Sequence, residues 1–509
     1  MSASKLNPMK KFLALFAFLG LFIISCSDDD DGTDPGSGIP MPPIEYTSGT
    51  ADLSNYVALG NSLTAGYTDN ALFIDSQVAS FPNMITGSFD EVGGGEFIIP
   101  FMADNLGGMT LGGNPIAGNR LILDFSSGSP TPRPVDGQGT TEITNVLSGP
   151  FNNMAIPGAK SFHLLAPGYG NVAGVAQGLA NPYFARMASS PNARIIDDAM
   201  AQNPTFFTLW IGNNDVLGFA TSGGSGIDQT GNLDPSTYGG SDITDPNVFA
   251  NVFNTLLQTL TANGASGVVA NIPDVTSIPF FTTVPHNPIP LDPATADLVN
   301  GAYAAYNGGL QQLQALGVIS AEEVARRLIS FTAGPGNAVV ILDEDLTDLT
   351  AFNPALINMR QATEDDLLTF TSQTIIGTPA DPNDPNSING VAVPLADQWV
   401  LTPEEQELIA NATTNFNQTI EALAQQYNLG FVDANATLKV LADTGIPLSD
   451  GSVLTSTYGT GGAFSLDGVH PSPRGSAVIA NLFLEAMEAR FGSVLPPIDP
   501  LEYKGLYIN

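Results

Sequence analysis

Three kinds of residue are scarce in this chain of 509 residues: cysteine, basic residues and histidine. The single cysteine, Cys26, excludes an intrachain disulfide. Lysine and arginine together number 15 against 50 aspartates and glutamates, which gives a formal net charge of -35 at pH 7. Because phosphate contacts need clustered basic side chains, this balance argues against nucleic-acid binding, and it would also repel a polyanionic substrate.

The scarcity of histidine leaves few candidates for a general base. His286 lies in the proline-rich stretch "TTVPHNPIP", which is typical of a loop, and His163 follows a glycine turn, where it could be packed or exposed. His470, in "FSLDGVHPSPRG", comes three residues after Asp467 and just before a predicted helix. In a turn, this spacing lets the carboxylate reach Nδ1 of the imidazole. The pair alone is weak evidence, because acids are common near helix N-termini for other reasons.

The N-terminal segment has the order of a secretory signal. Lys5, Lys10 and Lys11 precede an apolar stretch over residues 12–24, which is short for a membrane span and is followed by Cys26. The sequence "LFIISC" resembles a bacterial lipobox, which implies that residues 1–25 are removed and that Cys26 carries the lipid anchor. The alternative is a thiol that happens to end a signal peptide.

Residues 26–50 include "SDDDDGTDPGSGIPMPPIEY", rich in aspartate, glycine and proline and without apolar periodicity. This composition predicts an acidic flexible tether. An acidic run directly after the cysteine resembles the surface-export signal of Bacteroidetes lipoproteins, although a solvated spacer would read the same. We therefore expect a cell-envelope protein, an outer-membrane lipoprotein, with the face of the membrane left open.

Residues 51–509 alternate short apolar runs with helical patterns, which predicts an α/β domain with a parallel sheet covered on both faces. Predicted core strands are residues 55–59, 153–156, 205–211, 267–271 and 430–433. Predicted helices are residues 246–263, 295–316, 321–328, 402–427 and 472–491, and the 402–427 helix begins with a capping box at Thr402 and Glu405.

No break in composition and no internal repeat divides residues 51–509, so the sequence predicts a single domain. Three long insertions interrupt it, near residues 71–150, 217–245 and 279–400. Loops of this length are uncommon unless they are functional or disordered, and we expect these insertions to roof a substrate site.

Three polar segments follow predicted strands, where the chemistry of α/β folds collects. In "YVALGNSLTAGY", Ser62 comes after a buried run and is either a nucleophile or a turn residue. In "FFTLWIGNND", two asparagines follow the strand, and a side-chain amide there is either an oxyanion donor or part of a turn. In "NMAIPGAKS", Gly158 either makes a turn or lets a carbonyl approach a backbone N–H closely.

Taken together, "GNSL", "NMAIPG", "GNND" and "DGVH" resemble, in this order, blocks I, II, III and V of the SGNH, or GDSL-like, hydrolases. The resemblance implies a flavodoxin-like, three-layer α/β/α fold with a five-stranded parallel sheet and long loop insertions. Two departures are visible. Asn61 stands where the family has aspartate, and the distance between blocks I and II is far longer than in compact members.

The resemblance also implies a role for each matching residue. Ser62 is the expected nucleophile, His470 the base and Asp467 the acid that orients it. The expected oxyanion donors are the backbone N–H groups of Ser62 and Gly158 and the side-chain amide of Asn214. No metal and no cofactor are needed for this chemistry.

The implied activity is hydrolysis of a small-molecule or lipid ester through an acyl-enzyme on Ser62. We favour esters of acyl lipids because of the expected membrane anchor and long insertions. A carbohydrate acetylesterase and a non-catalytic surface protein that binds glycans or lipids remain alternatives. Some apolar side chains of the first insertion either line an acyl channel or simply pack: Phe81, Phe89, Phe97, Phe101, Met102 and Met109.

Overall fold

The computed structural model describes residues 44–126 and 128–508. The predicted signal peptide, Cys26 and most of the predicted tether therefore lie outside the described residues. Residues from Tyr46 onward form one unit by their internal contacts. Within the described ranges, no helix combines the length and the apolar character that crossing a bilayer requires.

A parallel four-stranded sheet forms the centre of this unit, with the strand order β1-β7-β8-β17. Its strands are β1 (Tyr56–Gly60), β7 (Phe206–Trp210), β8 (Ser266–Ala270) and β17 (Gly430–Val432). Every residue of β1 and β7 is buried, as expected when both faces of a parallel sheet are covered. The predicted mixed α/β architecture is confirmed, with four strands.

The fifth predicted strand, residues 153–156, runs beside β1 without forming a regular strand. Ala58 N–H donates to the Asn152 carbonyl at 2.9 Å, and Met154 N–H donates to the Ala58 carbonyl at 2.8 Å. The side chain of Asn153 accepts from its own neighbour, Ala155 N–H, at 3.2 Å, and Pro157 has no N–H to continue a ladder. The segment is therefore a short edge rather than a fifth strand, and the flavodoxin-like layering stays a prediction.

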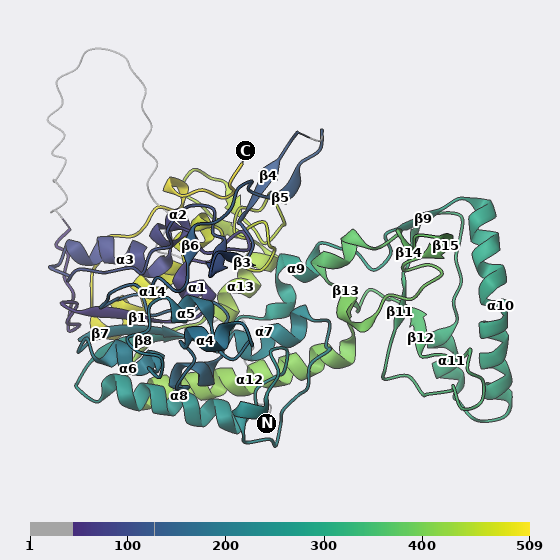
Figure 1. Ribbon diagram of the computed structural model, residues 1–509, viewed down its shortest axis with the longest axis horizontal. Helices are drawn as coiled ribbons and strands as arrows, with labels where there is room; N and C mark the ends of the chain where they lie inside the picture. The colour runs from purple at the N-terminus through teal and green to yellow at the C-terminus, as the bar shows by residue number, and fades with distance from the viewer. Residues whose placement is uncertain (1–43, 127, 509) are drawn as a thin grey trace, which may run out of the picture. The chain divides into compact units, whose positions relative to one another are not determined.

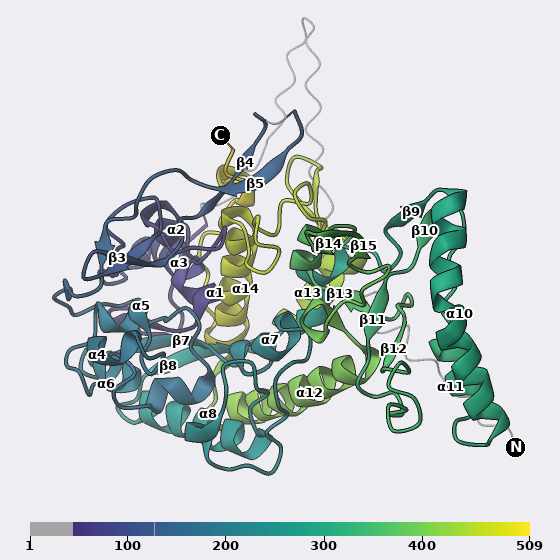
Figure 2. The same cartoon turned by 45° about the vertical axis from the view of Figure 1, so that its right-hand side comes forward.

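Helices cover both faces of the sheet because side chains alternate along each strand. Tyr56 and Ala58 pack with α3 (Phe81–Asp90) and α14 (Pro473–Phe491), whereas Val57 and Leu59 belong to the core that holds helices of the opposite face. That second core includes α6 (Ile195–Met200), α8 (Pro246–Thr261) and α12 (Pro403–Gln426). Figures 1 and 2 show α8 and α12 lying side by side.

The predicted helices agree closely with the observed ones: α8, α12, α14, α10 (Pro293–Ala315) and α11 (Ala321–Arg327). The capping box of α12 is present. Thr402 N–H donates to Glu405 Oε2 at 2.7 Å, and Glu405 N–H donates to Thr402 Oγ1 at 3.4 Å. Strong end signals therefore placed this helix from sequence alone.

The insertions carry short elements rather than bare loops. The first holds α2 (Ile74–Val78), α3, β2 (Met109–Leu111), β3 (Asn114–Ala117), β4 (Leu121–Asp124), β5 (Thr131–Pro134) and β6 (Thr141–Glu142). Between it and β7 lie α4 (Val172–Val175), α5 (Pro182–Ala185) and α6, and β7 is followed by α7 (Asn214–Thr221).

The third insertion, residues 279–400, folds around a hydrophobic core of its own, which contains side chains from Ile289 to Val400. Antiparallel pairs join β9 with β10, β11 with β12, β13 with β16, and β14 with β15 (Figure 1). The insertion begins with the short helix α9 (Pro279–Thr282). The bounds of the paired strands are β9 (Ile289–Leu291), β10 (Gly334–Asn337), β11 (Val340–Leu342), β12 (Met359–Gln361), β13 (Leu367–Leu368), β14 (Pro379–Asp381), β15 (Asp384–Ile388) and β16 (Val400–Leu401).

The chain after β17 returns to the sheet through α13 (Ala434–Asp443), the pair β18 (Ile446–Pro447) and β19 (Val453–Leu454), and α14. The loop between β19 and α14 carries Asp467 and His470. It therefore brings the candidate base to the carboxyl ends of the strands, where Ser62 follows β1.

Candidate active site

Ser62 is held at the tight junction between β1 and the short helix α1 (Ser62–Ala65). Asn61 caps the helix, because its Oδ1 accepts from Leu63 N–H at 3.1 Å. A side chain at Gly60 would overlap Thr64 and the Trp210 carbonyl, so glycine is required for the turn. As the first residue of a helix, Ser62 has a backbone N–H without an intrahelical acceptor. The turn thus offers both a hydroxyl and an N–H to one site.

Ser62, His470 and Asp467 form a continuous chain of hydrogen-bonding groups. Ser62 Oγ lies 2.9 Å from His470 Nε2, and His470 Nδ1 lies 3.0 Å from Asp467 Oδ2. A carboxylate on Nδ1 fixes the proton there and leaves Nε2 to accept the serine proton. The structure thus brings together the three residues that the sequence analysis singled out for nucleophile, base and acid.

Asp467 is held in its ionised form. Burial disfavours its charge, but the His470 ring and the N–H groups of His470 and Val469 outweigh this and lower the pKa of Asp467 to about 2. Both N–H groups donate to Asp467 Oδ1 at 2.8 Å, and Asn70 N–H donates to Oδ2 at 2.9 Å. A carboxylate that is charged at neutral pH can stabilise an imidazolium on His470.

The sequence analysis missed a turn at Asp69 and Asn70 that holds the loop of Asp467 and His470 by hydrogen bonds. Asp69 and Asn70 both adopt left-handed backbone conformations, with φ of 51° and 62°. Asp69 N–H donates to Ser465 Oγ at 3.0 Å, and Asp69 Oδ1 accepts from Leu466 N–H at 2.9 Å. Burial raises the pKa of Asp69 to about 7. The adjacent Asp and Asn after α1 were the available signal, since these residues tolerate left-handed turns.

Asn214 lines the same cavity as Ser62, and Gly158 comes two residues after Ile156, whose N–H donates to the Gly60 carbonyl at 3.0 Å. Asn214 is the first residue of α7, and its Nδ2 donates one N–H to the Ala159 carbonyl at 2.9 Å, which leaves the second for another acceptor. Gly158 has φ of +80° and is exposed. The segment just after Gly158 is tied to α7 by Asp215, whose carboxylate accepts from Ser161 N–H at 2.8 Å and from Ser161 Oγ at 2.7 Å.

Asn61, which stands where the hydrolase pattern has aspartate, connects two segments of the site through its side chain. Its Nδ2 donates to Asn213 Oδ1 at 3.0 Å, and both side chains are buried. The amide therefore ties the Ser62 turn to the start of α7, the helix that carries Asn214. An aspartate at this position could accept but not donate while ionised, so asparagine suits the Asn213 carbonyl oxygen.

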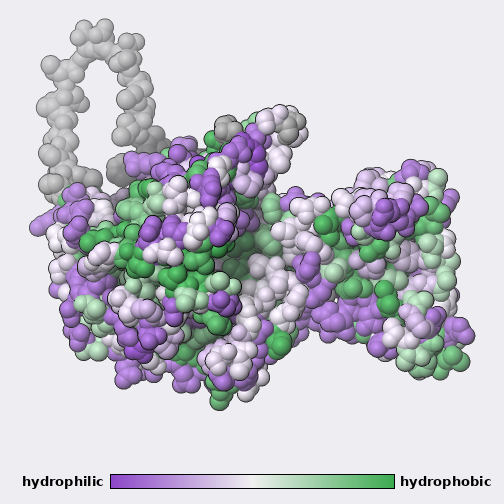
Figure 3. Space-filling model, viewed as in Figure 1, coloured by the Kyte–Doolittle hydropathy of each residue, from purple (hydrophilic) through white to green (hydrophobic). Residues whose placement is uncertain are grey.

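A cavity of about 120 Å³ opens at Ser62 and His470 and runs between α13 and α14. Its lining is apolar, with Trp210, Val275, Leu438, Leu441, Val478 and Leu482 among the described residues that form it. Among those described residues none is aspartate, glutamate, lysine or arginine. Figure 3 shows hydrophobic side chains around a hollow near the places of α1 and α13 in Figure 1. The Ser62 hydroxyl group therefore lies beside an apolar cavity.

Of the three insertions, only the second contributes to the lining of this cavity, through Leu217, and the third contacts the loop of Asp467 and His470, where Phe280 N–H donates to the Gly468 carbonyl at 2.9 Å. That the insertions roof the site stays a prediction. None of the first-insertion side chains considered for an acyl channel lines this cavity. Phe81 stacks on Phe483 at 4.4 Å and Phe89 meets the ring of Tyr56 edge-on at 5.3 Å, so both cover the sheet. The third insertion has its own apolar core to fill, which accounts for its hydrophobic side chains.

The other two histidines have contacts elsewhere. His163 stacks on Tyr169 at 4.2 Å, and its Nδ1 accepts from Lys160 N–H at 3.0 Å. Burial, together with the charge of Lys160, lowers the pKa of His163 to about 4, so the ring is neutral at pH 7. His286 lies before β9 in the third insertion, where its carbonyl accepts from Val339 N–H. His470 alone of the three meets Ser62.

Comparison with known proteins gave matches only among solved structures. No family model and no curated protein matches the chain. A putative GDSL-like lipase from Parabacteroides merdae is 10% identical, with a TM-score of 0.30 over 87% of this chain and 98% of that one. A catalytic mutant of an acetylxylan esterase from Geobacillus stearothermophilus is 10% identical, with a TM-score of 0.30 over 86% and 95%. An extracellular lipase from Streptomyces rimosus is 11% identical, with a TM-score of 0.28 over 86% and 99%.

Proposed function

We propose that this protein is a serine esterase that hydrolyses carboxylic esters of acyl lipids. The observation that carries the proposal is the uncharged, apolar cavity that begins at Ser62 and His470. An acyl chain bound there would bury apolar surface while its carbonyl carbon lies at Ser62 Oγ. An acetyl group has no chain to fill such a cavity, which favours lipid esters over acetylated carbohydrates.

The reaction follows from the hydrogen-bond chain. His470 Nε2 takes the proton of Ser62 as Oγ bonds to the acyl carbon, and Asp467 stabilises the resulting imidazolium. The oxyanion receives hydrogen bonds from the N–H groups of Ser62 and Gly158 and from the free N–H of Asn214 Nδ2. His470 then gives its proton to the departing alkoxide.

Deacylation repeats these steps with water as the nucleophile. His470 takes a proton from water as the hydroxyl oxygen attacks the acyl-Ser62 carbon, and the proton then passes to Ser62 Oγ as the acid departs. The serine is restored, and the net change is one ester and one water converted to an acid and an alcohol. Every proton is carried by residues of this chain.

The test is hydrolysis of p-nitrophenyl esters from acetyl to palmitoyl, with Ser62→Ala and His470→Ala as controls. We expect activity with an optimum at long acyl chains and its loss in both variants. An optimum at acetyl would point to a carbohydrate acetylesterase instead. If folded protein hydrolyses no ester and a fluorophosphonate probe leaves Ser62 unlabelled, the protein is a binding protein of the same fold.

We further propose that Cys26 carries a lipid that anchors the protein in the outer membrane. Support comes from the basic, apolar and small-residue order of residues 5–26 and the acidic segment after it. Metabolic labelling with an alkyne fatty acid would detect the modification. We expect the label and the membrane association to disappear in Cys26→Ala, and equal labelling of that variant would refute the anchor.

A further inference from the structure

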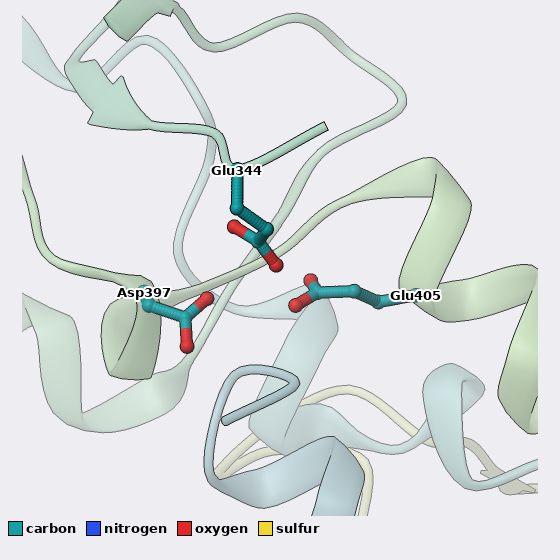
Figure 4. A group of neighbouring side chains, drawn as sticks. All are labelled: Glu344, Asp397 and Glu405. Atoms are coloured by element: carbon teal, nitrogen blue, oxygen red, sulfur yellow. The ribbon is translucent and has the colours of Figure 1, made fainter. Parts of the chain in front are cut away.

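Three carboxylates from separate segments meet away from Ser62. Glu344 follows β11, Asp397 opens the short helix before β16, and Glu405 lies in the first turn of α12. One oxygen of each lies within 4.8 Å of an oxygen of the others, and Figure 4 shows the side chains pointing toward one another. Like charges at this spacing repel unless a proton or a cation lies among them.

Glu405 is the buried member of the cluster, with only 4% of its surface exposed. Its Oε2 accepts from Thr402 N–H at 2.7 Å and from Thr402 Oγ1 at 2.9 Å. Its other oxygen, Oε1, is buried and has no hydrogen-bond partner among the described residues. Burying a carboxylate oxygen without a hydrogen-bond donor or a cation costs free energy. Glu405 Oε1 is therefore an oxygen that a cation would stabilise.

Neighbouring basic side chains do not supply a positive charge to the cluster. Arg326 is engaged beside the cluster, at 3.5 Å from Asp343 and 3.3 Å from Glu404. In the part of the chain that the structure describes, no ion pair includes Glu344, Asp397 or Glu405. The negative charge of the cluster is therefore not compensated by a side chain.

Burial and mutual repulsion act together on two of the three carboxylates. Burial, opposed by the Thr402 hydrogen bonds and reinforced by Glu344 and Asp397, raises the pKa of Glu405 to about 8. Burial and the Glu344 charge also raise the pKa of Asp397, against a hydrogen bond from Ser225. A divalent cation among the three carboxylates would relieve their mutual repulsion.

Further oxygen and space are available around the three carboxylates. Asn358 lines the same cavity as Glu344 and Asp397, and its Oδ1 is buried without a partner while its Nδ2 donates to the Leu346 carbonyl at 2.7 Å. Gly224 has φ of +77°, and a Cβ there would overlap Glu405 Oε1. A second buried oxygen thus belongs to a residue of the same cavity, and a glycine leaves room for the Glu405 carboxylate.

We propose that Glu344, Asp397 and Glu405, with Asn358 Oδ1, bind a divalent cation of the calcium class. The donors are all oxygen, as hard cations prefer. Oxygens on opposite sides of Ca²⁺ are about 4.6–5.2 Å apart, so three oxygens within 4.8 Å of one another can surround one ion. The ion would fasten the third insertion to α12, a helix of the sheet's own core. This site is independent of the catalytic proposal.

Calorimetric titration of the purified protein with CaCl₂, after dialysis against EGTA, tests the site. We expect one calcium ion to bind and to raise the unfolding temperature. Asp397→Asn and Glu344→Gln should weaken binding at least about 10-fold. Glu407→Gln is the matched control, because it removes the same charge from an exposed position of α12 and should keep the affinity within about 3-fold.

Glu405→Gln separates loss of a ligand from loss of the fold. Its side-chain carbonyl can still accept from Thr402, so in EGTA the variant should unfold at no lower temperature than the natural protein, and calcium should add nothing. Two results would overturn the proposal. One is no calcium binding by the natural protein, and the other is equal weakening by Glu407→Gln, which would mean general attraction to an acidic surface.

Discussion

Asn214 combines an observed structural hydrogen bond with a proposed role as an oxyanion donor. One N–H of its Nδ2 donates to the Ala159 carbonyl. This hydrogen bond fixes the orientation of the amide and therefore the direction of its second N–H. We predict that Asn214→Ala lowers kcat by roughly 100-fold to 1000-fold with little change in KM, because an oxyanion donor acts mainly in the transition state. Steady-state kinetics on a p-nitrophenyl ester checks this, with circular dichroism to confirm folding. An unchanged kcat would show that another donor holds the oxyanion.

Asp69 predicts a pH dependence of stability. Its pKa is raised from 3.8 to about 7, so between these pH values the folded protein holds a proton that the unfolded chain has lost. Stability from this group is therefore greatest at low pH and falls as pH rises toward 7. Asp69→Asn keeps an acceptor for Leu466 N–H without the charge.

We expect Asp69→Asn to unfold at nearly the same temperature as the natural protein near about pH 4, and at a higher temperature near about pH 8. Thermal melts followed across this range measure the difference. Asp90→Asn, at an exposed position, is the control and should show no such trend. A gap between the two melting temperatures that is constant or narrows with rising pH would contradict the assignment.

Among single residues, the sequence could indicate those that lie in a recognisable short motif. Ser62, Gly158, Asn214, Asp467 and His470 each lie in a short motif after a strand or before a helix. Asp69 and the carboxylates of Glu344 and Asp397 have no such motif. Their partners lie far away in the chain, as with Asp69 and Leu466, so only folding reveals the contact.

The helix α13 offers a test of the apolar cavity. Leu441 lines the cavity and is buried, whereas its neighbour Val440 is 51% exposed. We predict that Leu441→Phe lowers kcat/KM for a long-chain ester at least about 10-fold relative to the acetyl ester, because the larger ring fills space that the acyl chain needs. Val440→Phe makes the same change on the outer side and should leave the chain-length profile as it is. The profile of p-nitrophenyl esters decides, and matching shifts in both variants would argue against the cavity as the acyl site.

Elements with strong local signals were predictable, and those that depend on context were not. The capping box and apolar spacing placed α12, and the buried runs placed β1, β7, β8 and β17. Residues 153–156 have the composition of a strand but lie at the edge, where Asn153 turns its amide group back on its own backbone. The first insertion covers the sheet through Phe81 and Phe89. The hydrophobic side chains of a glycine-rich segment do not by themselves indicate which surface they will cover.

The charge of the whole chain gives a prediction that belongs to no single residue. With a formal net charge of -35, the folded molecule repels itself more strongly than the expanded unfolded chain does. We expect the unfolding temperature, measured in EGTA, to rise as NaCl increases from about 0.01 M to about 0.3 M, because salt screens charges beyond a Debye length of about 10 Å. An unfolding temperature that is unchanged or falls would mean that local ion pairs outweigh the general repulsion.

The distance along the chain between Ser62 and His470, 408 residues, has a consequence for how the protein is made. During synthesis from the N-terminus, the serine leaves the ribosome before its base, and the whole segment between them must be added before the two can meet. The strand pairing of β17 with β8 also closes across the entire third insertion. Long-range closure of this kind is slow compared with local folding. A chain interrupted before the loop that carries Asp467 and His470 therefore has the hydroxyl without the base, and the proposed activity cannot arise until that loop has been made.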